Sequence, residues 1–554
     1  MKSYRGDRGR RSVRAQHVST AQALIPQRAQ PSSRQRAARA ATAAIPVAFL
    51  AVFFAWPLVA IFRRSLVPDG SLDVPVDVLT ASSTWHVAWF TFWQATVSTG
   101  LTLVAGLPLA WALARFSFPG RSLVEALVLV PFVLPTIVVA TAFIALLPDG
   151  VEHSIWAILL AHVFFNVAVV VRVVGAFWSG LDQRLWDAAA TLGAGPLARQ
   201  RSVTLPLLAP ALASAASIVF LFCFTSFGVI VVLGGIRYAT LETEIYNQAA
   251  RLFELRTAAA LALLQLAAVV AVVIVSGTLE RRLGGARRRG RRAPRPTGRT
   301  TIAVAAVVAL SLGLLALPPL ALVVRSLQVA GGYGLEHFTS LADSTPALLV
   351  TPWHAVLNSL VFAAVAAAIA LAVGIPAALS VARGSRGVDA LLMLPLGASA
   401  AMLGFGFLLA FADPPLDLRS SLAIVPLAQA LVAAPFVVRS LAPALRARDD
   451  RLPEAAAVLG ATPAQVRREI ELPLLARPLA VAAGLAFAVA LGEFGATVFV
   501  VRADWPTLPV AIFRFLGRPG ADNVGTAMAL CVVLMALVIV VALVSQRAVG
   551  KGAR

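Results

Sequence analysis

A loop motif that occurs twice is the part of this sequence with the clearest chemical meaning. Each copy has an acidic residue, a run of alanines and then a glycine, and the copies lie 267 residues apart. We expect each acid to lie where a short helix begins, because its charge complements the positive helix N-terminus. The alanines favour helix without adding bulk, and the glycine permits the positive-φ turn that ends the helix. The matched positions are Asp187, Ala188, Ala189 and Gly193 in the first copy and Glu454, Ala455, Ala456 and Gly460 in the second.

Two roles fit these loops. A helix face without bulk lets another protein approach closely, which predicts a docking surface. An ordinary interfacial loop also uses alanine for helicity and glycine for a turn, so packing is the alternative. Two copies that agree at six spaced positions favour docking, although duplication alone preserves a packing motif.

A carboxyl group at membrane depth is the second feature with chemical meaning. Glu493 lies between Gly492 and Gly495 in a long apolar stretch, and it is the only strong intramembrane carboxyl group that the sequence indicates. Such groups are costly in lipid and usually face a bundle interior or an aqueous cavity. Its repeat partner is Ser226, so the two halves differ in charge there. We expect Glu493 and Ser226 to line a substrate pathway that suits a cation, with a hydrogen bond from Glu493 to a neighbouring helix as the alternative.

Two further polar residues, His162 and Asn166, lie one helical turn apart. We expect a hydrogen bond between helices there, with a place in a cavity as the alternative. The repeat has Gln429 where the first half has His162, and no group of Cys, His and carboxylate residues has ligand spacing. We therefore expect no metal site and no cofactor.

Lysine occurs only at Lys2 and Lys551, which decides who binds nucleotide. A phosphate-binding loop needs the pattern Gly-x-x-x-x-Gly-Lys-Ser/Thr, and neither lysine provides it. The sequence also lacks a nucleophile elbow and the spacing of a catalytic triad. We expect no catalytic residues and no enzyme activity in this chain. If ATP powers the protein, another chain binds it.

The composition places these residues in a lipid bilayer. The chain of 554 residues is 59% hydrophobic and 13% charged, with a mean hydropathy of +0.84, whereas soluble domains carry about 25% charged residues. Its formal charge of +21 would indicate nucleic acid in a soluble domain. Much of the basic charge instead lies outside the apolar stretches, as in cytoplasmic segments of membrane proteins. We expect no nucleic-acid partner.

We expect an all-α polytopic membrane protein with about twelve spans, since a spanning helix needs about twenty mostly apolar residues. Two six-helix halves, residues 43–278 and 301–546, are joined by an Arg-rich linker at 279–300. A basic disordered tail (1–42) and a short tail (547–554) flank them, and an even span number puts both tails and the linker in the cytoplasm. The predicted spans lie near residues 43–63, 88–114, 123–147, 155–178, 205–234, 257–277, 301–324, 354–382, 388–412, 420–441, 474–501 and 523–545.

The repeat extends beyond the loops. The same offset of 267 residues relates Phe227-Gly228 to Phe494-Gly495 and Thr240-Leu241 to Thr507-Leu508. Because the offset covers an even number of spans, the repeat is parallel, about an axis along the membrane normal. Many ion-coupled carriers use inverted repeats instead, which weakly disfavours that class.

The duplicated loop resembles the EAA signature of permease subunits in binding-protein-dependent ABC importers. In that family the loop forms the coupling helix that docks into a groove of the ATPase subunit. The resemblance implies that the eight loop residues contact two copies of a cytoplasmic ATP-binding subunit. It also implies an external, periplasmic or extracellular, substrate-binding protein and a place in the bacterial inner membrane. The first copy departs from the signature by having Asp187 for Glu, which keeps the charge but shortens the reach.

Fused twelve-helix permeases of this family serve chiefly thiamine and ferric-iron importers, and this chain resembles the thiamine permeases more closely. The resemblance implies thiamine as the substrate. Ferric iron is the second choice, and another small solute or an ion-coupled carrier stays open. The strings that carry the likeness include Phe118-Pro-Gly-Arg121, Leu159-Leu-Ala-His162-Val-Phe-Phe-Asn166 and Thr240-Leu-Glu-Thr-Glu-Ile-Tyr246.

Overall fold

The structure, a computed structural model, describes residues 33–550 except 69, 236, 284–293, 413–415 and 450. Most of the predicted N-terminal tail, the centre of the linker and the last four residues therefore lie outside the described residues. The first helix, α2 (Ser33–Leu50), begins inside the predicted tail, ahead of the predicted span at 43–63. Within the described residues, β1 (Gln328–Val329) and β2 (Gly332–Tyr333) form the one antiparallel strand pair.

The first half is built of helices joined by short π-helical turns. Its elements after α2 are η1 (Ala51–Ala55), α3 (Trp56–Leu66), α4 (Val76–Thr80), α5 (Ser82–Arg115), α6 (Arg121–Val133), α7 (Thr136–Leu146), α8 (Ile155–Ser179), α9 (Gln183–Thr191), α10 (Pro196–Arg199), η2 (Gln200–Thr204), α11 (Leu205–Phe224), α12 (Gly228–Leu233), α13 (Leu241–Tyr246), η3 (Asn247–Arg251) and α14 (Leu255–Leu283).

The second half repeats this order. Its elements are α15 (Arg299–Ser326), α16 (Glu336–Thr339), η4 (Ser340–Ala342), α17 (Pro352–Ala382), α18 (Arg386–Gly397), α19 (Ala400–Ala410), α20 (Ile424–Arg446), α21 (Arg451–Val458), α22 (Pro463–Gln465), η5 (Val466–Glu471), α23 (Leu472–Gly492), α24 (Thr497–Val500), α25 (Leu508–Leu516) and α26 (Ala521–Gly550).

Two of the twelve predicted spans are bent. Among the described residues, ten helices are long and apolar enough to cross a membrane, and the pairs α6–α7 and α18–α19 bring the number to twelve if each pair is one span. These pairs bend by 99° and 89°. Pro135 explains the first bend, because proline forces the preceding Leu134 into an extended conformation. At the second bend the Ser399 hydroxyl caps α19 by accepting the N–H of Met402 at 2.9 Å.

The predicted spans at 205–234 and 474–501 end early. Helix α11 stops at Phe224 and α23 at Gly492, and each is followed by a break and a short helix, α12 or α24. Ser226 and Glu493 therefore lie in the two breaks. The expectation that Glu493 sits inside a continuous helix is wrong. Its position at the end of α23 exposes unpaired backbone groups that its own side chain can satisfy.

The two halves interlock. Within the first half α5 packs against α8 and α11, and within the second half α17 packs equivalently against α20 and α23. The first span of each half, however, lies on the other half: α15 packs along α5 and α7, whereas α2 packs on α17 and α3 on α19. Burial of each half's first helix by the other half makes the pair one folding unit.

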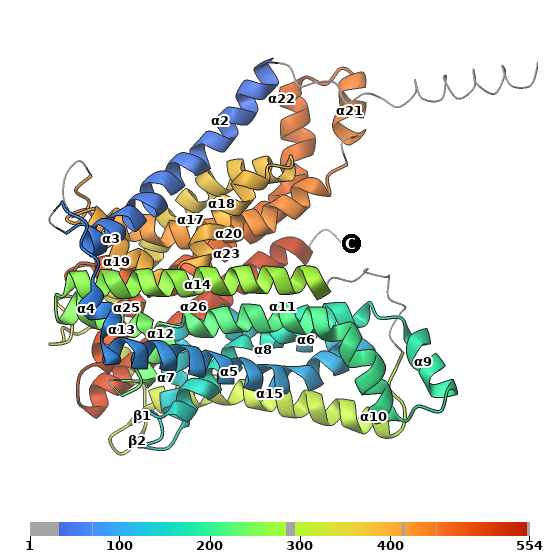
Figure 1. Cartoon of the computed structure of the whole chain (residues 1–554), viewed down its shortest axis with the longest axis horizontal. Helices are drawn as coiled ribbons and strands as arrows, with labels where there is room; N and C mark the ends of the chain where they lie inside the picture. The colour runs from blue at the N-terminus through green and yellow to red at the C-terminus, as the bar shows by residue number, and fades with distance from the viewer. Residues whose placement is uncertain are drawn as a thin grey trace, which may run out of the picture.

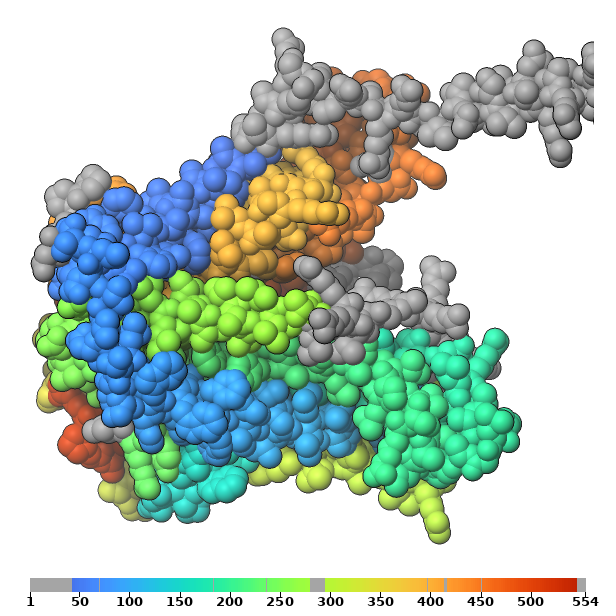
Figure 2. Space-filling model, viewed as in Figure 1, coloured from blue at the N-terminus to red at the C-terminus, as the bar shows by residue number. Residues whose placement is uncertain are grey.

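Both copies of the duplicated loop lie at the same end of the molecule. Figure 1 shows α9 and α10 at the right together with α21, α22 and the end of α26, while α4, α13 and the β1–β2 pair lie at the left. This arrangement is the one expected of a parallel repeat. Figure 2 shows the surface hollowed at the right, between the orange residues of the second loop and the blue-green residues of the first.

Helix α19 approaches α24 closely enough that Gly404 has no room for a side chain. A Cβ at this position would lie 2.5 Å from the carbonyl oxygen of Ala496 and 2.7 Å from its Cα. Both are backbone atoms, which cannot swing aside. Small residues permit such close helix contacts in membrane proteins.

We expect Gly404→Ala to lower the melting temperature of the purified protein in detergent, because overpacking a well-packed interior costs about 1–3 kcal/mol. Gly387→Ala is the matched control. It also lies in a helix, but an added Cβ meets nothing within 4 Å, so its stability should be unchanged or higher. Equal melting temperatures for Gly404→Ala and the wild type would contradict the close packing of α19 on α24.

Candidate functional site

The first copy of the loop starts earlier than the sequence predicts. Helix α9 begins at Gln183, and the Asp182 carboxylate caps it by accepting the backbone N–H of Arg184 at 3.0 Å. Asp187 therefore lies inside α9 and not where the helix begins, which corrects the expectation for that copy. Aspartate is among the strongest N-cap residues, so Asp182 takes the capping position. Glu454 does lie in the first turn of α21.

The turns that end α9 and α21 are alike. Gly193 has φ +83° and Gly460 has φ +87°, so both adopt the positive φ expected from the sequence. In each copy the N–H of the residue after glycine returns to an alanine carbonyl at 3.0 Å, from Ala194 to Ala189 and from Ala461 to Ala456. The second alanine of each copy thus closes its turn through the backbone.

Large apolar side chains stand out at these turns, and the sequence analysis missed them. Leu192 is 88% exposed, and its repeat partner Leu459 and the adjacent Val458 are each 87% exposed. Both leucines directly precede the glycine, so the repeat itself contained the signal. Exposed apolar side chains that gather on one surface mark contacts with other proteins. The acid, the first alanine and the glycine of each copy are exposed as well.

The first loop is held in place by Trp186. Its indole N–H donates to the Thr204 hydroxyl at 3.0 Å, and the Arg199 guanidinium lies 4.1 Å from the ring centroid. The Arg115 guanidinium lies 5.7 Å from the same centroid. Cation–π contacts of this kind stabilise by about 0.5–2 kcal/mol. Trp186 therefore ties α9 to the start of α11 and to the end of α5.

A central cavity of about 340 Å³ lies between the two halves and brings Ser226 and Glu493 together. Its walls are the four places where spans are interrupted, α6–α7, α11–α12, α18–α19 and α23–α24, together with faces of α8 and α20. The breaks that the sequence did not predict are thus the elements that build this site. Whether substrate passes Glu493 and Ser226 remains a prediction.

Glu493 uses its carboxyl group to hold α24. One carboxyl oxygen accepts the N–H of Ala496 at 2.7 Å and the other accepts the N–H of Thr497 at 3.0 Å. The side chain lines the cavity and is 6% exposed. The hydrogen bonds run to the next turn of its own chain and not to a neighbouring helix. Glu493 therefore supports the second-half break and presents an acidic group to the cavity.

His162 holds the first-half break. Its Nε2 lies 2.9 Å from the Ser226 hydroxyl, and its Nδ1 lies 3.0 Å from the Ser98 hydroxyl on α5. The expected hydrogen bond between helices is confirmed. Asn166, one turn along α8, donates to the His162 carbonyl at 3.0 Å. Both residues also line the central cavity, so the two alternatives hold together.

A second buried carboxyl group corrects the view that Glu493 is the only strong one. Glu242 in α13 is fully buried and accepts hydrogen bonds from the Ser399 hydroxyl at 2.7 Å and from the Gln265 side-chain amide. Ser399 belongs to the second half, so this contact joins the halves beside the cavity. The repeat offers a signal here too, because Pro509 stands where the first half has Glu242.

Four aromatic residues close the central cavity toward the left end of Figure 1. Phe227 stacks on its repeat partner Phe494 with ring centroids 5.4 Å apart. Tyr246 meets Phe227 at 5.6 Å, its repeat partner Phe513 meets Phe494 at 5.3 Å, and these two outer rings are 6.0 Å apart. We call this group the aromatic tetrad. Its members obey the 267-residue offset, so it straddles the axis that relates the halves.

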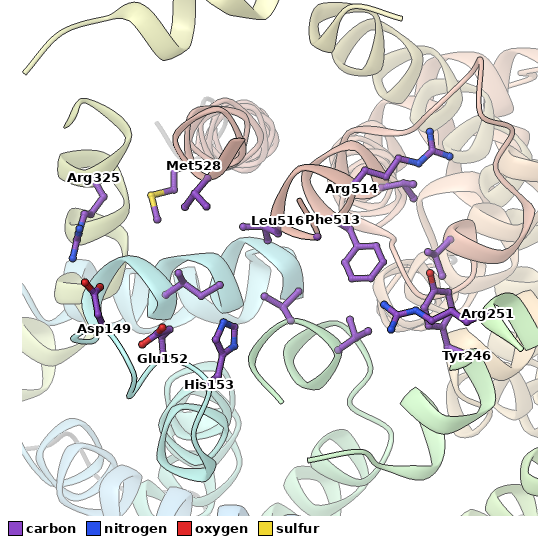
Figure 3. A pocket seen from close by; sticks show the side chains of 17 residues that line it. Asp149, Glu152, His153, Tyr246, Arg251, Arg325, Phe513, Arg514, Leu516 and Met528 are labelled. Atoms are coloured by element: carbon purple, nitrogen blue, oxygen red, sulfur yellow. The ribbon is translucent and has the colours of Figure 1, made fainter. Parts of the chain in front are cut away.

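A second cavity, of about 580 Å³, lies on the other side of the tetrad, and we call it the distal cavity. Phe227 and Phe494 line the central cavity, whereas Tyr246 and Phe513 line the distal one, so the tetrad separates the two. Figure 3 shows charges of both signs in its wall. They are Asp149, Glu152, Arg251, Arg325 and Arg514. Among the described residues, no three His, Cys, Asp or Glu side chains gather as metal ligands.

Two segments of the chain, residues 104–285 and 306–554, match the family described as the binding-protein-dependent transport system inner membrane component. Each segment contains one copy of the duplicated loop and one of the cavity-forming breaks near Ser226 and Glu493. The chain belongs to this family. It is accordingly a multi-pass permease component of an ABC importer and not an enzyme.

Similar permeases are known from several bacteria. The thiamine transport system permease protein ThiP of Brucella abortus (strain 2308) is 30% identical over 534 residues, which covers 90% of this chain and 93% of that protein. ThiP of Escherichia coli (strain K12) is 28% identical over 497 residues, 84% of this chain and 90% of that protein. A putative 2-aminoethylphosphonate permease, PhnV of Salmonella paratyphi A, is 30% identical over 262 residues, 46% of this chain and 95% of that protein.

For this permease we expect Gly193→Val and Gly460→Val to impair ATP-driven transport without preventing membrane insertion. A β-branched side chain resists the positive φ that both turns require, and a left-handed residue other than glycine costs about 1–2 kcal/mol. The double variant should be worse than either single one. The measurement is substrate uptake per inserted protein, in proteoliposomes that also contain the ATPase.

Gly195→Val is the matched control in the same loop. Gly195 has φ −67° and ψ 167°, an extended conformation open to any residue, and an added Cβ meets nothing within 4 Å. Its transport should stay near wild type. Normal transport by the Gly193→Val, Gly460→Val double variant would contradict a docking role for these loops.

Proposed function

We propose that this chain is the permease subunit of an ATP-driven thiamine importer in the bacterial inner membrane. The observation that carries the substrate is end-to-end similarity to the ThiP permeases, which extends over about nine tenths of both chains. The similarity to PhnV, in contrast, covers less than half of this chain. Both tails and the linker are cytoplasmic, in agreement with their basic charge and with the loop-bearing end of the molecule.

Two copies of a cytoplasmic ATP-binding subunit dock on the two loops, and an external binding protein delivers thiamine at the opposite end. Support for two ATPase copies comes from the likeness of the loops. Each has the same positive-φ turn, the same exposed leucine and the same pattern of exposed acid and alanine. Two like surfaces fit two copies of one partner. The distal cavity, on the other side of the tetrad from these loops, faces the binding protein.

Movement at the loops reaches the tetrad through two long helices. The spans Pro196–Phe224 and Pro463–Gly492 run without a sharp bend from each loop to each break. At 1.5 Å per residue each measures about 45 Å. The rings of Phe227 and Phe494 follow these helices by only a few residues. A displacement of the loops by the ATPase therefore shifts the two helix ends that hold the stacked pair.

The tetrad acts as the barrier of the pathway in this state. It closes the central cavity from the distal one, and the surface is hollowed between the loops at the cytoplasmic end. Alternation requires the stacked pair to part when the loops approach each other. Each aromatic contact adds only about 0.5–1.5 kcal/mol beyond burial. Such a barrier is weak enough to be opened by ATP binding in the partner.

Reconstitution tests this function directly. Proteoliposomes that contain the permease, its ATP-binding subunit and its binding protein should accumulate labelled thiamine only when ATP is present. The isolated permease should hydrolyse no ATP, because its only lysines, Lys2 and Lys551, lie in no phosphate-binding loop. ATP hydrolysis by the isolated chain, free of contaminating ATPase, would contradict the proposal. So would uptake of ferric iron or 2-aminoethylphosphonate in place of thiamine.

A further inference from the structure

We infer that the central cavity is a transit site for an aromatic organic cation that carries no phosphate group. In this site Glu493 meets the positive charge, and the Asn166 side of the first half binds a polar group of the same ligand. The inference rests on the proposed function and makes it more specific. It gives the permease a selectivity of its own, separate from that of the binding protein.

The charge of the cavity wall is the first observation. Among the described residues that line it, Glu493 is the only acidic one, and neither lysine nor arginine is present. Each Glu493 oxygen accepts one backbone N–H, which leaves further lone pairs for another partner. A phosphate group would meet a carboxyl group and no cation in a poorly hydrated space, which is unfavourable. The distal cavity differs, because three arginines lie in its wall.

The aromatic wall is the second observation. Several of these rings already contact each other, as Phe132 does with Phe165 at 5.5 Å and with Phe222 at 5.8 Å. Aromatic faces attract organic cations and stack on flat rings. A volume of about 340 Å³ suits a small molecule. The phenylalanines that line the cavity are Phe132, Phe165, Phe222, Phe227, Phe436 and Phe494.

An unsatisfied acceptor is the third observation. Asn166 is 1% exposed, and its amide nitrogen donates to the His162 carbonyl and to the Cys223 sulfur. Its Oδ1 has no hydrogen-bond partner in the described structure. A buried acceptor without a partner costs about 1–3 kcal/mol. An amino group on the ligand would satisfy it, and the Ser226 hydroxyl, held by His162, lies in the same wall.

The halves offer different groups, which fixes the direction of the ligand. The repeat partners of His162 and Asn166 are Gln429 and Ala433, and neither lines the cavity. The second half instead contributes Glu493. A ligand with a cationic ring at one end and an amino-bearing ring at the other is therefore held in one orientation across the axis. Thiamine has this chemistry, and its phosphate esters add the group that the cavity disfavours.

The test is direct binding to the permease–ATPase complex in nanodiscs, without the binding protein. We expect saturable binding of labelled thiamine and weaker binding of thiamine monophosphate. Glu493→Gln and Asn166→Leu should each weaken thiamine binding, by about five-fold for Glu493→Gln, the upper range for a screened charge pair. In Glu493→Gln the gap between thiamine and its monophosphate should also narrow. The comparison of the two ligands on the wild-type complex needs no variant to fold.

Glu244→Gln is the matched control. Glu244 is a carboxyl residue of α13 that accepts from Gln248 at 2.7 Å and does not line the cavity. Its binding should equal the wild type, and melting temperatures identify any variant that is misfolded. Normal ATP-driven uptake of thiamine together with no binding to the complex, or with equal binding of thiamine and its monophosphate, overturns this inference and leaves the proposed function intact. Absence of thiamine uptake by the full system overturns both.

Discussion

The stacking of Phe227 on Phe494 is the contact on which the rest of this structure depends. It is the meeting point of the two halves, and the rings of Tyr246 and Phe513 extend it with the same symmetry. Because these four rings fill the axis, the space between the halves is divided into a central and a distal cavity. The first spans, α2–α3 and α15, each wrap the opposite half and hold this contact closed.

The cavity exists because four spans are interrupted at one place. Irregular backbone at membrane depth is tolerated only where protein or a polar cavity satisfies its N–H and C=O groups. Here side chains do that work: Glu493 binds the N–H groups that open α24, and Ser399 caps α19. The polar groups needed to end and restart helices are therefore the same groups that face the cavity. Structure and selectivity share Glu493.

The sequence predicts the features that depend on local chemistry and on the repeat. The alanine–glycine loops, the positive φ of Gly193 and Gly460 and the two-half organisation follow from residue types and one offset. What it missed depends on distant partners. Glu242 is buried because Ser399, 157 residues away, approaches it. The Asp182 cap was missed because another acidic residue, Asp187, matched the repeat and drew the helix start to the wrong place.

Passive leak of thiamine tests most directly whether the tetrad is the barrier. The protein to use is the Phe227→Ala, Phe494→Ala double variant, reconstituted without ATP in liposomes loaded with labelled thiamine. The control is Phe92→Ala, Phe220→Ala, another aromatic pair, with centroids 5.7 Å apart, that lines neither cavity. Our account predicts faster efflux from the tetrad variant than from the wild type and the control. Equal efflux from all three, with the tetrad variant folded, would contradict it.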